Sequence, residues 1–197
     1  MNGYDIFSQR RIVVLGSRST GKSSLVTRFV EDSFSDAYSP TIAEMTYEHP
    51  IAYADKDLNC KIVDVAGYDE FSILNPCHAI GVHGYLLVYS IDSTKSFDNI
   101  KTTYDKIIDF TGLQSVPAAI VGQKADLTTI RRVTVKQGQA LARKLGCAFI
   151  ETSAQSNVDV EKPFHLCLDE IENELKRKRQ WPPERPQAQE ESQCLPM

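Results

Sequence analysis

The chain has 197 residues, of which 42% are hydrophobic and 24% charged, and this is the length and composition of one folded domain. Its 22 basic and 26 acidic residues give a net charge of −4, which argues against nucleic-acid binding by bulk electrostatics. No apolar run approaches the ~20 residues that cross a bilayer, and the opening residues MNGYDIFSQRR lack the apolar stretch of a secretory signal. Asn2 stands where N-myristoylation requires glycine, and five scattered cysteines favour a reducing compartment.

Short apolar runs typical of strands alternate with longer helical patterns. We expect strands at 11–15, 45–53, 59–63, 85–89, 118–121 and 147–150, and helices at 22–30, 96–110, 135–145 and 158–178. Residues 33–41 are expected to form a loop, and 54–57 a turn between two strands. The alternation predicts an α/β fold, in which a mostly parallel sheet has helices on both faces and binds ligands at the carboxyl ends of its strands.

The last helix is expected to place Phe164, Leu168, Ile171 and Leu175 on one apolar stripe. After residue 179 the composition becomes polar and rich in proline. Such a segment has too few apolar side chains to pack, so we expect a domain at 1–179 and a flexible tail at 180–197.

Residues 16–23 (GSRSTGKS) fit the phosphate-binding pattern G-x-x-x-x-G-K-[ST] between an expected strand and an expected helix. Glycines allow consecutive backbone N–H groups to surround phosphate oxygens, and the start of the helix adds its positive end. Lys22 supplies a cation for the β- and γ-phosphates, and Ser23 a hydroxyl for Mg²⁺. We therefore expect nucleotide phosphates to be bound by Gly16, Ser17, Arg18, Ser19, Thr20, Gly21, Lys22 and Ser23.

Two further groups are candidates for the metal and the γ-phosphate. Asp64-Val65-Ala66-Gly67 ends the third expected strand. A D-x-x-G pattern is common by chance, but after a phosphate loop it predicts that Asp64 holds Mg²⁺ through water and that the Gly67 N–H meets the γ-phosphate. Thr41 is a candidate second hydroxyl for Mg²⁺, and an ordinary loop threonine is the alternative.

The segment Gln123-Lys124-Ala125-Asp126 follows a later strand and predicts which base is bound. A carboxylate at Asp126 accepts both N1–H and N2–H of guanine, a pair of donors that adenine lacks. The methylenes of Lys124 can lie along the base. Ser153-Ala154, after the last strand, can bring a backbone N–H to the guanine O6.

With these motifs the chain resembles the Ras superfamily of small GTPases over about residues 9–178, and within it the Rheb branch, because of Arg18 and the strand GYLLVYS at 84–90. The resemblance implies a P-loop GTPase fold with a six-stranded sheet, one strand antiparallel, and five helices. It implies two segments ordered by the γ-phosphate, which we name the switch I segment (residues 35–46) and the switch II segment (residues 67–78). It also implies nucleotide contacts by Ser24, Phe34 and Tyr38, with Phe34 edge-on to guanine. The partners it implies are an effector, the TOR kinase complex, and a GTPase-activating protein.

Three residues depart from the family's pattern. Tyr68 replaces the glutamine that orients the attacking water and has no amide to do so, so we expect slow hydrolysis by a site containing Tyr68, Gly67, Lys22 and Thr41, and a faster Tyr68→Gln variant. Gln123 replaces asparagine, and its extra methylene is expected to misplace its hydrogen bonds to neighbouring loops. Gln155 replaces a lysine beside the base, which together with Gln123 lowers the expected affinity.

The terminal Cys194-Leu195-Pro196-Met197 has the form C-a-a-X, and the final methionine favours farnesyl on Cys194. An unmodified tail cysteine is the alternative, since Pro196 is unusual there. The basic run 176–179 adds attraction to an anionic membrane, or simply ends a helix with cations. A lipidated chain is expected on the cytoplasmic face of endomembranes, and an unmodified one in the cytoplasm.

Three functions remain open from the sequence. The first is a slow, membrane-anchored switch that binds GTP and GDP with Mg²⁺. The second is a pseudo-GTPase binding module held in one nucleotide state, which Tyr68 and Gln123 motivate. The third is a P-loop ATPase or nucleotide kinase, against which Asp126 and Ser153-Ala154 count. Outside the site, we expect core or subsurface positions for Cys60, Cys77, Cys147 and Cys167, and core positions for Tyr85 and Tyr89.

Overall fold

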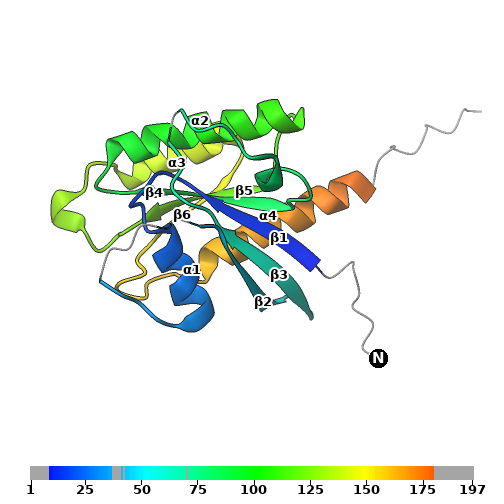
Figure 1. The fold of residues 1–197 in the computed structure, drawn as a ribbon, viewed down its shortest axis with the longest axis horizontal. Coiled ribbons are helices and arrows are strands. Elements are labelled where there is room, and N and C mark those ends of the chain that lie inside the picture. The colour runs from blue at the N-terminus through cyan, green and yellow to red at the C-terminus, as the bar shows by residue number, and fades with distance from the viewer. Residues whose placement is uncertain (1–8, 37–40, 42, 70, 180–197) are drawn as a thin grey trace, which may run out of the picture.

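A six-stranded sheet lies between two layers of helices, as the alternation of patterns predicts (Figure 1). The structure is a computed structural model that describes residues 9–36, 41, 43–69 and 71–179. The strands are β1 (Gln9–Leu15), β2 (Met45–Tyr53), β3 (Lys56–Asp64), β4 (Gly84–Ser90), β5 (Ala118–Gln123) and β6 (Ala148–Thr152). The helices are α1 (Lys22–Glu31), α2 (Thr94–Thr111), α3 (Val135–Leu145) and α4 (Lys162–Arg179), with 3₁₀ turns at Pro76–His78 and Thr128–Ile130.

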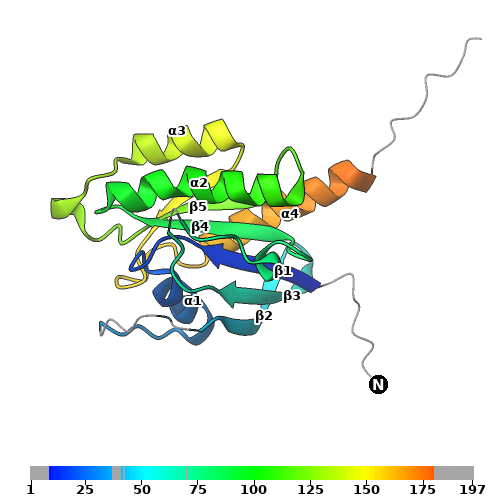
Figure 2. The ribbon, with the colours of Figure 1, turned by 45° about the horizontal axis from the view of Figure 1, so that its top comes forward.

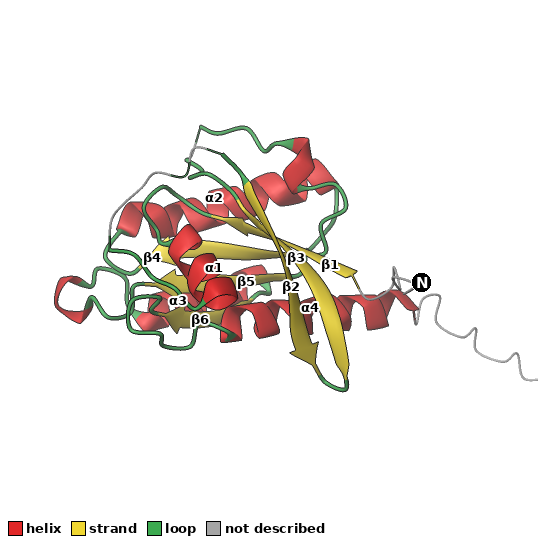
Figure 3. Cartoon of the chain, turned by 60° about the horizontal axis from the view of Figure 1, so that its bottom comes forward, coloured by secondary structure: helices red, strands yellow, loops and turns green. Residues whose placement is uncertain are grey.

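The strand order is β2-β3-β1-β4-β5-β6, in which β2 pairs antiparallel with β3 and every other pair is parallel. The parallel strands β1, β3, β4 and β5 end at the same edge of the sheet, and the loops that follow them gather there (Figure 3). This edge is where an open parallel sheet binds its ligand. The phosphate loop and the Gln123–Asp126 segment both lie at it.

Side-chain alternation along the strands gives each face of the sheet its own core. Val63 of β3 packs in one core with Ile100, Tyr104 and Ile107 of α2 and Ala142 of α3, and Figure 2 shows both helices over that face. Even-numbered residues of β3 such as Ile62 belong to the other core, with Leu25 and Val26 of α1 and the expected stripe of α4, Phe164, Leu168, Ile171 and Leu175. Asp64 shares the parity of Ile62, so its side chain faces the α1 side.

Several predicted boundaries were wrong for local reasons. β3 begins at Lys56, because Tyr53 already pairs with Lys56 across a two-residue turn. α4 begins at Lys162 and not at residue 158, because Val158 and Ser153 exchange two backbone hydrogen bonds in an isolated bridge. Tyr85 and Tyr89 lie in the core as predicted. Cys60 and Cys167 are buried and Cys147 is partly buried, but Cys77 is exposed, contrary to the expectation.

The implied five helices were also wrong: among the described residues there are four α-helices, and the described residues of the switch II segment are irregular up to the 3₁₀ turn Pro76–His78. Two carbonyls there accept side-chain donors, Ile73 O from the Tyr68 hydroxyl and Ser72 O from Lys106 Nζ. Asn75, which precedes proline, is extended (φ −68°, ψ 129°). The helical conformation is disfavoured before proline, and the extended Asn75 interrupts any helix at this point.

No helix in the described part of the chain is long and apolar enough to cross a membrane.

Candidate nucleotide site

The phosphate loop joins β1 to α1 with a shape that only its glycines allow. Gly16 has φ +154°, and a Cβ there would lie 2.0 Å from the Val88 carbonyl oxygen. Within the loop the carbonyl of Ser17 accepts hydrogen bonds from the Thr20 hydroxyl and from Lys22 Nζ, each 2.9 Å long. Both of these contacts are made within the loop. Ser19 and Arg18 are exposed, while Ser24 is half-buried in the first turn of α1.

Lys22 is buried, with 5% of its surface exposed, at the first position of α1. Burial lowers the pKa of its ammonium group to about 8, although the nearby Asp64 carboxylate favours the charged form. An ammonium group that has lost its water gains strongly from an anion, because burial weakens screening. The position therefore suits a point charge for bound phosphate.

The three predicted metal ligands come together beside Lys22. The hydroxyls of Ser23 and Thr41 share a hydrogen bond of 2.7 Å, although one lies on α1 and the other in the switch I segment. Asp64 is 1% exposed, and burial raises the pKa of its carboxyl group, against a hydrogen bond from Ser23 and the charge of Lys22. Its Oδ1 is buried and has no hydrogen-bond partner in the described structure. Two hydroxyls and a carboxylate oxygen form a donor set suited to a hard cation such as Mg²⁺.

Gly67 is packed against the phosphate loop. A Cβ at this position would lie 2.6 Å from Arg18 Cα, so only glycine allows the approach. The next residue, Tyr68, donates its N–H to the Gly16 carbonyl at 2.8 Å. The main chain that follows β3 is thus bonded directly to the loop that follows β1.

The side chain of Tyr68 points away from this junction into the core. It is 6% exposed and packs in the core beneath α2, among residues such as Val65 and Leu74. Burial raises the pKa of its hydroxyl, which therefore stays protonated and donates to the Ile73 carbonyl. A ring held in this way is not in the place of a side chain that orients water above the phosphate loop.

The base-recognition residues are brought together at the ends of β5 and β6. Gln123 is 1% exposed, and its Oε1 accepts from the N–H of Lys124 at 2.8 Å, the Thr152 hydroxyl at 3.3 Å and the N–H of Ala154 at 3.3 Å. The expectation that the longer side chain misplaces these links was therefore wrong for its oxygen. Its Nε2, in contrast, is buried without a partner among the described residues.

Asp126 accepts a hydrogen bond from the Ser153 hydroxyl, which fixes the carboxylate beside the Ser153–Ala154 turn. Lys124 has φ +67°, and the chain reverses there, with the Ala125 N–H bonded to the Thr152 carbonyl at 3.0 Å. The remaining candidates are less defined. Phe34 is half-buried in the loop after α1, whereas Tyr38 and Cys194 lie outside the described residues.

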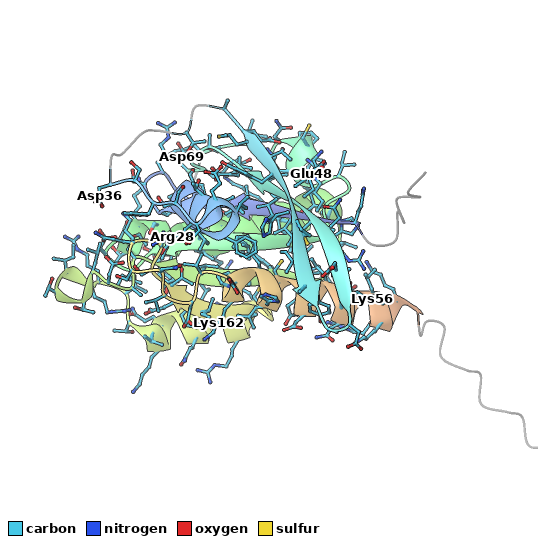
Figure 4. The ribbon with its side chains drawn as sticks, turned by 90° about the horizontal axis from the view of Figure 1, so that it is seen from below. Arg28, Asp36, Glu48, Lys56, Asp69 and Lys162 are labelled. Carbon is cyan, nitrogen blue, oxygen red and sulfur yellow. The ribbon has the colours of Figure 1, made fainter. Side chains whose placement is uncertain are left out.

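Figure 4 shows that the labelled Asp36 and Asp69, one from each switch segment, lie toward the end of the molecule opposite the labelled Lys56. A side-chain contact joins the two segments: His78 Nε2 and Glu44 Oε2 are 2.8 Å apart. The sequence did not predict this pair, and nothing in the spacing of the two residues signals it.

Comparison with known proteins agrees with this geometry. Residues 11–173 match the Ras family. The chain belongs to the Ras family. It is 49% identical over 165 residues to "GTP-binding protein rhb1" of Schizosaccharomyces pombe, covering 84% of this chain and 89% of that protein. It is 47% identical over 165 residues to "Small monomeric GTPase RhbA" of Aspergillus fumigatus, covering 83% and 88%. It is 41% identical over 163 residues to "GTP-binding protein Rheb" of Homo sapiens, covering 83% and 88%.

These relatives place the chain in the Rheb branch of the Ras superfamily, as the sequence predicted. It is a small GTPase that binds guanine nucleotide and acts as a Rheb-type switch. Membership in this family rules out the third function considered above, an ATPase or nucleotide kinase.

Proposed function

We propose that this Rheb-type GTPase uses Mg²⁺ held by the Ser23 and Thr41 hydroxyls, and by Asp64 through water. The observation that carries the proposal is the buried Asp64 Oδ1, which lacks a partner beside the bonded Ser23 and Thr41 hydroxyls. Mg²⁺ bound there would neutralise charge on the β- and γ-phosphates. In this proposal Lys22 binds the same phosphates, Gly67 offers its N–H to the γ-phosphate, and Asp126 reads guanine.

Chelation tests the metal and its ligands together. With EDTA in excess, bound fluorescent GDP should leave the wild type at least tenfold faster, because the metal couples phosphate to Ser23. The Asp64→Asn variant should release GDP faster than wild type in Mg²⁺ and respond less to EDTA. Equal release with and without EDTA would refute the metal assignment.

Hydrolysis by this chain is proposed to be slow, at or below about 10⁻⁴ s⁻¹, the scale of unassisted Ras-type enzymes. The support is the position of Tyr68, whose ring is buried and whose hydroxyl is bonded to Ile73. Single-turnover hydrolysis of preloaded GTP measures the rate.

The burial of Tyr68 also favours a second candidate function, a module held in one nucleotide state. Nucleotide extracted from the purified protein distinguishes the two: GDP supports a cycling switch, and GTP alone supports a locked one.

The output of the switch is proposed to be an effector that binds the switch segments, with the TOR kinase complex as the candidate implied by the resemblance. A contiguous exposed apolar patch on a folded domain often marks a partner surface. Phe71 and Ile73 in the switch II segment are 87% and 90% exposed. Purified TOR complex should respond to the GTP-loaded protein, less to the GDP-loaded protein, and less to Phe71→Asp. A GTPase-activating protein is proposed to act at the same face.

Anchoring is proposed through farnesyl on Cys194, placing the protein on the cytoplasmic face of endomembranes. α4 ends on the side of the molecule opposite the phosphate loop (Figure 1), so a lipid beyond residue 179 would leave the nucleotide site free. The basic residues 176–179 would add about 1 kcal/mol each at an anionic surface. Intact-mass measurement on protein from eukaryotic cells should show the lipid, and Cys194→Ser should remove it. Wild-type protein of unmodified mass would refute the anchor and place the protein in the cytoplasm.

A further inference from the structure

Asn99 is a buried polar residue on α2 that belongs to none of the sequence motifs. Only 7% of its surface is exposed, and it lies on the inward face of the helix with Ile100, Thr103 and Ile107. Asparagine is a poor helix former, and at an inward position an apolar side chain would normally stand. A buried amide needs hydrogen-bond partners to offset the loss of water.

Both N–H bonds of the Asn99 amide have partners in the nucleotide site. Nδ2 donates to the Ser17 hydroxyl at 3.0 Å and to the Tyr68 carbonyl at 2.9 Å. Ser17 belongs to the phosphate loop, and its own carbonyl binds Lys22 Nζ. Tyr68 directly follows Gly67, and its N–H is bonded to Gly16. One amide group therefore joins the two loops on which the γ-phosphate contacts depend.

The chemistry of the two acceptors explains why an asparagine suits position 99. A carbonyl oxygen such as that of Tyr68 only accepts, so it needs a donor, whereas the Ser17 hydroxyl can donate or accept. Asn99 offers two N–H groups from one nitrogen and satisfies both. Aspartate would keep the Ser17 contact by accepting from the hydroxyl, but its carboxylate would repel the Tyr68 carbonyl.

α2 holds the switch II segment at a second point two turns further on. Lys106 Nζ donates to the Ser72 carbonyl at 2.7 Å and lies 5.8 Å from the centre of the Tyr68 ring. Residues seven apart lie on the same face of a helix. Asn99 and Lys106 therefore bind the Tyr68 and Ser72 carbonyls from one face of α2.

We infer that Asn99 is a positioning residue for GTP hydrolysis: it fixes the main chain at Gly67–Tyr68 against the phosphate loop and keeps Tyr68 in the core. This inference rests on the proposed contact between the Gly67 N–H and the γ-phosphate. Asn99 touches no reacting atom; it acts through Ser17 and Tyr68. GDP lacks the γ-phosphate, so loss of Asn99 should affect hydrolysis more than GDP binding.

The first test compares Asn99→Asp with the control Asp98→Asn, a change at the adjacent exposed position of α2. Single-turnover hydrolysis should fall about 3- to 30-fold in Asn99→Asp, the range of positioning effects that act through a network. GDP affinity should stay within twofold of wild type, and the control should match wild type in both. Equal hydrolysis in the two variants, or GDP affinity lost in parallel, would overturn the inference.

A second measurement reads the position of the main chain directly. Hydrogen exchange of the Tyr68 amide, followed by NMR in the GDP form, should be at least fivefold faster in Asn99→Asp than in Asp98→Asn. At low pH the carboxyl group introduced by Asn99→Asp is protonated and can donate to the Tyr68 carbonyl, so the ratio of variant to wild-type exchange should fall toward one. Asn99→Leu has no such group, and its ratio should not fall. Faster exchange of the Tyr68 amide with an unchanged rate of GTP hydrolysis would show that Asn99 has only a structural role and would overturn the inference.

If Asn99→Asp does not fold, the two hydrogen bonds of the Asn99 amide can still be tested in the wild-type protein. Both side-chain N–H protons of Asn99 should exchange slowly with water, because both are bonded inside the protein. Rapid exchange of either proton would refute the bridge. If both side-chain protons exchange slowly but the wild-type protein hydrolyses no GTP, the bridge is supported and the proposed slow hydrolysis is refuted.

Discussion

The phosphate loop and the switch II segment follow neighbouring parallel strands, β1 and β3, and they differ in how their carbonyls are bonded. In the phosphate loop the Ser17 carbonyl accepts from Thr20 and Lys22, residues three and five positions away. The switch II segment also has internal bonds, such as the one from Ser72 to Asp69. Its Tyr68 and Ser72 carbonyls, however, accept from Asn99 and Lys106 of α2. A carbonyl bonded within its own loop depends on local sequence, whereas a carbonyl bonded from another element depends on how distant elements pack.

The two loops also differ in which side chains they bury. The switch II segment buries the ring of Tyr68 but exposes Phe71 and Ile73. The phosphate loop, by contrast, buries the charged Lys22. One loop is therefore organised to bind an anion, and the other presents apolar surface. Substitution of Lys22 in the phosphate loop should lower nucleotide affinity, whereas substitution of Tyr68 in the switch II segment should lower the free energy of unfolding.

The largest expected effect is at Lys22. The Lys22→Ala variant loses the buried cation beside the phosphates and should bind GTP and GDP at least about a thousandfold more weakly, because a charge-assisted bond in a buried site is lost. Titration with a fluorescent GDP analogue measures it. Lys162→Ala, at an exposed position of α4, serves as the control and should bind normally. Retained affinity in Lys22→Ala would show that the loop does not bind phosphate.

The next effect is at Tyr68, where stability and rate should change in opposite directions. Tyr68→Gln removes a buried ring and should lower the free energy of unfolding by about 3 kcal/mol, as expected for a large core residue. Its amide can orient water, so single-turnover hydrolysis should be faster than in wild type. Tyr68→Phe keeps the ring, loses only the bond to Ile73, and should cost about 1 kcal/mol with no gain in rate. A Gln variant no faster than wild type would contradict the assignment of this position.

A smaller effect is expected from pH. The pKa of Lys22 is lowered to about 8, and bound phosphate should raise it, so binding above pH 8 must take up a proton. GDP affinity should therefore fall with pH above 8, by at most about tenfold per unit. The stability of the nucleotide-free protein should move the other way: between pH 8 and 10.5 the unfolded chain binds the extra proton at Lys22, so this residue makes unfolding less favourable as pH rises. Affinity independent of pH from 7 to 9 would contradict the buried ammonium.

The smallest effect concerns the link between the switch segments. His78 and Glu44 lie 2.8 Å apart, with the histidine side chain 6% and the glutamate side chain 38% exposed. A double-mutant cycle of Glu44→Ala and His78→Ala should give a coupling of about 0.5–1 kcal/mol in thermal unfolding, the range of a partly exposed pair. Strictly additive losses would show that the contact does not join the two segments.

The motif-bearing residues were predictable because their geometry is local or set by the parallel sheet. Lys22 and Ser23 follow from the phosphate-loop pattern, and Asp64 and Asp126 follow from their places at strand ends. Thr41 was placed by order in the chain alone, and the structure brings its hydroxyl to Ser23.

The switch II segment was not predictable from its own residues. Its shape depends on the packing of the Tyr68 ring against α2 and on a hydrogen bond from Lys106, which is 34 residues away from the Ser72 carbonyl that it binds. The one available signal was in α2 itself, where Asn99 and Thr103 interrupt the inward stripe. A polar side chain on an inward helical face indicates a buried partner but not its identity.

The pairing of β1 with β3 aligns Val14 with Asp64. Successive side chains of a strand point to opposite faces, so one residue inserted within β3 would turn Asp64 toward α2 and place an apolar side chain beside Ser23. The exposed turn between Tyr53 and Lys56 lies at the other end of the hairpin and can absorb an added residue without shifting that register. The β2–β3 hairpin should therefore tolerate changes of length at residues 54–55 and lose nucleotide binding when its length changes near Asp64.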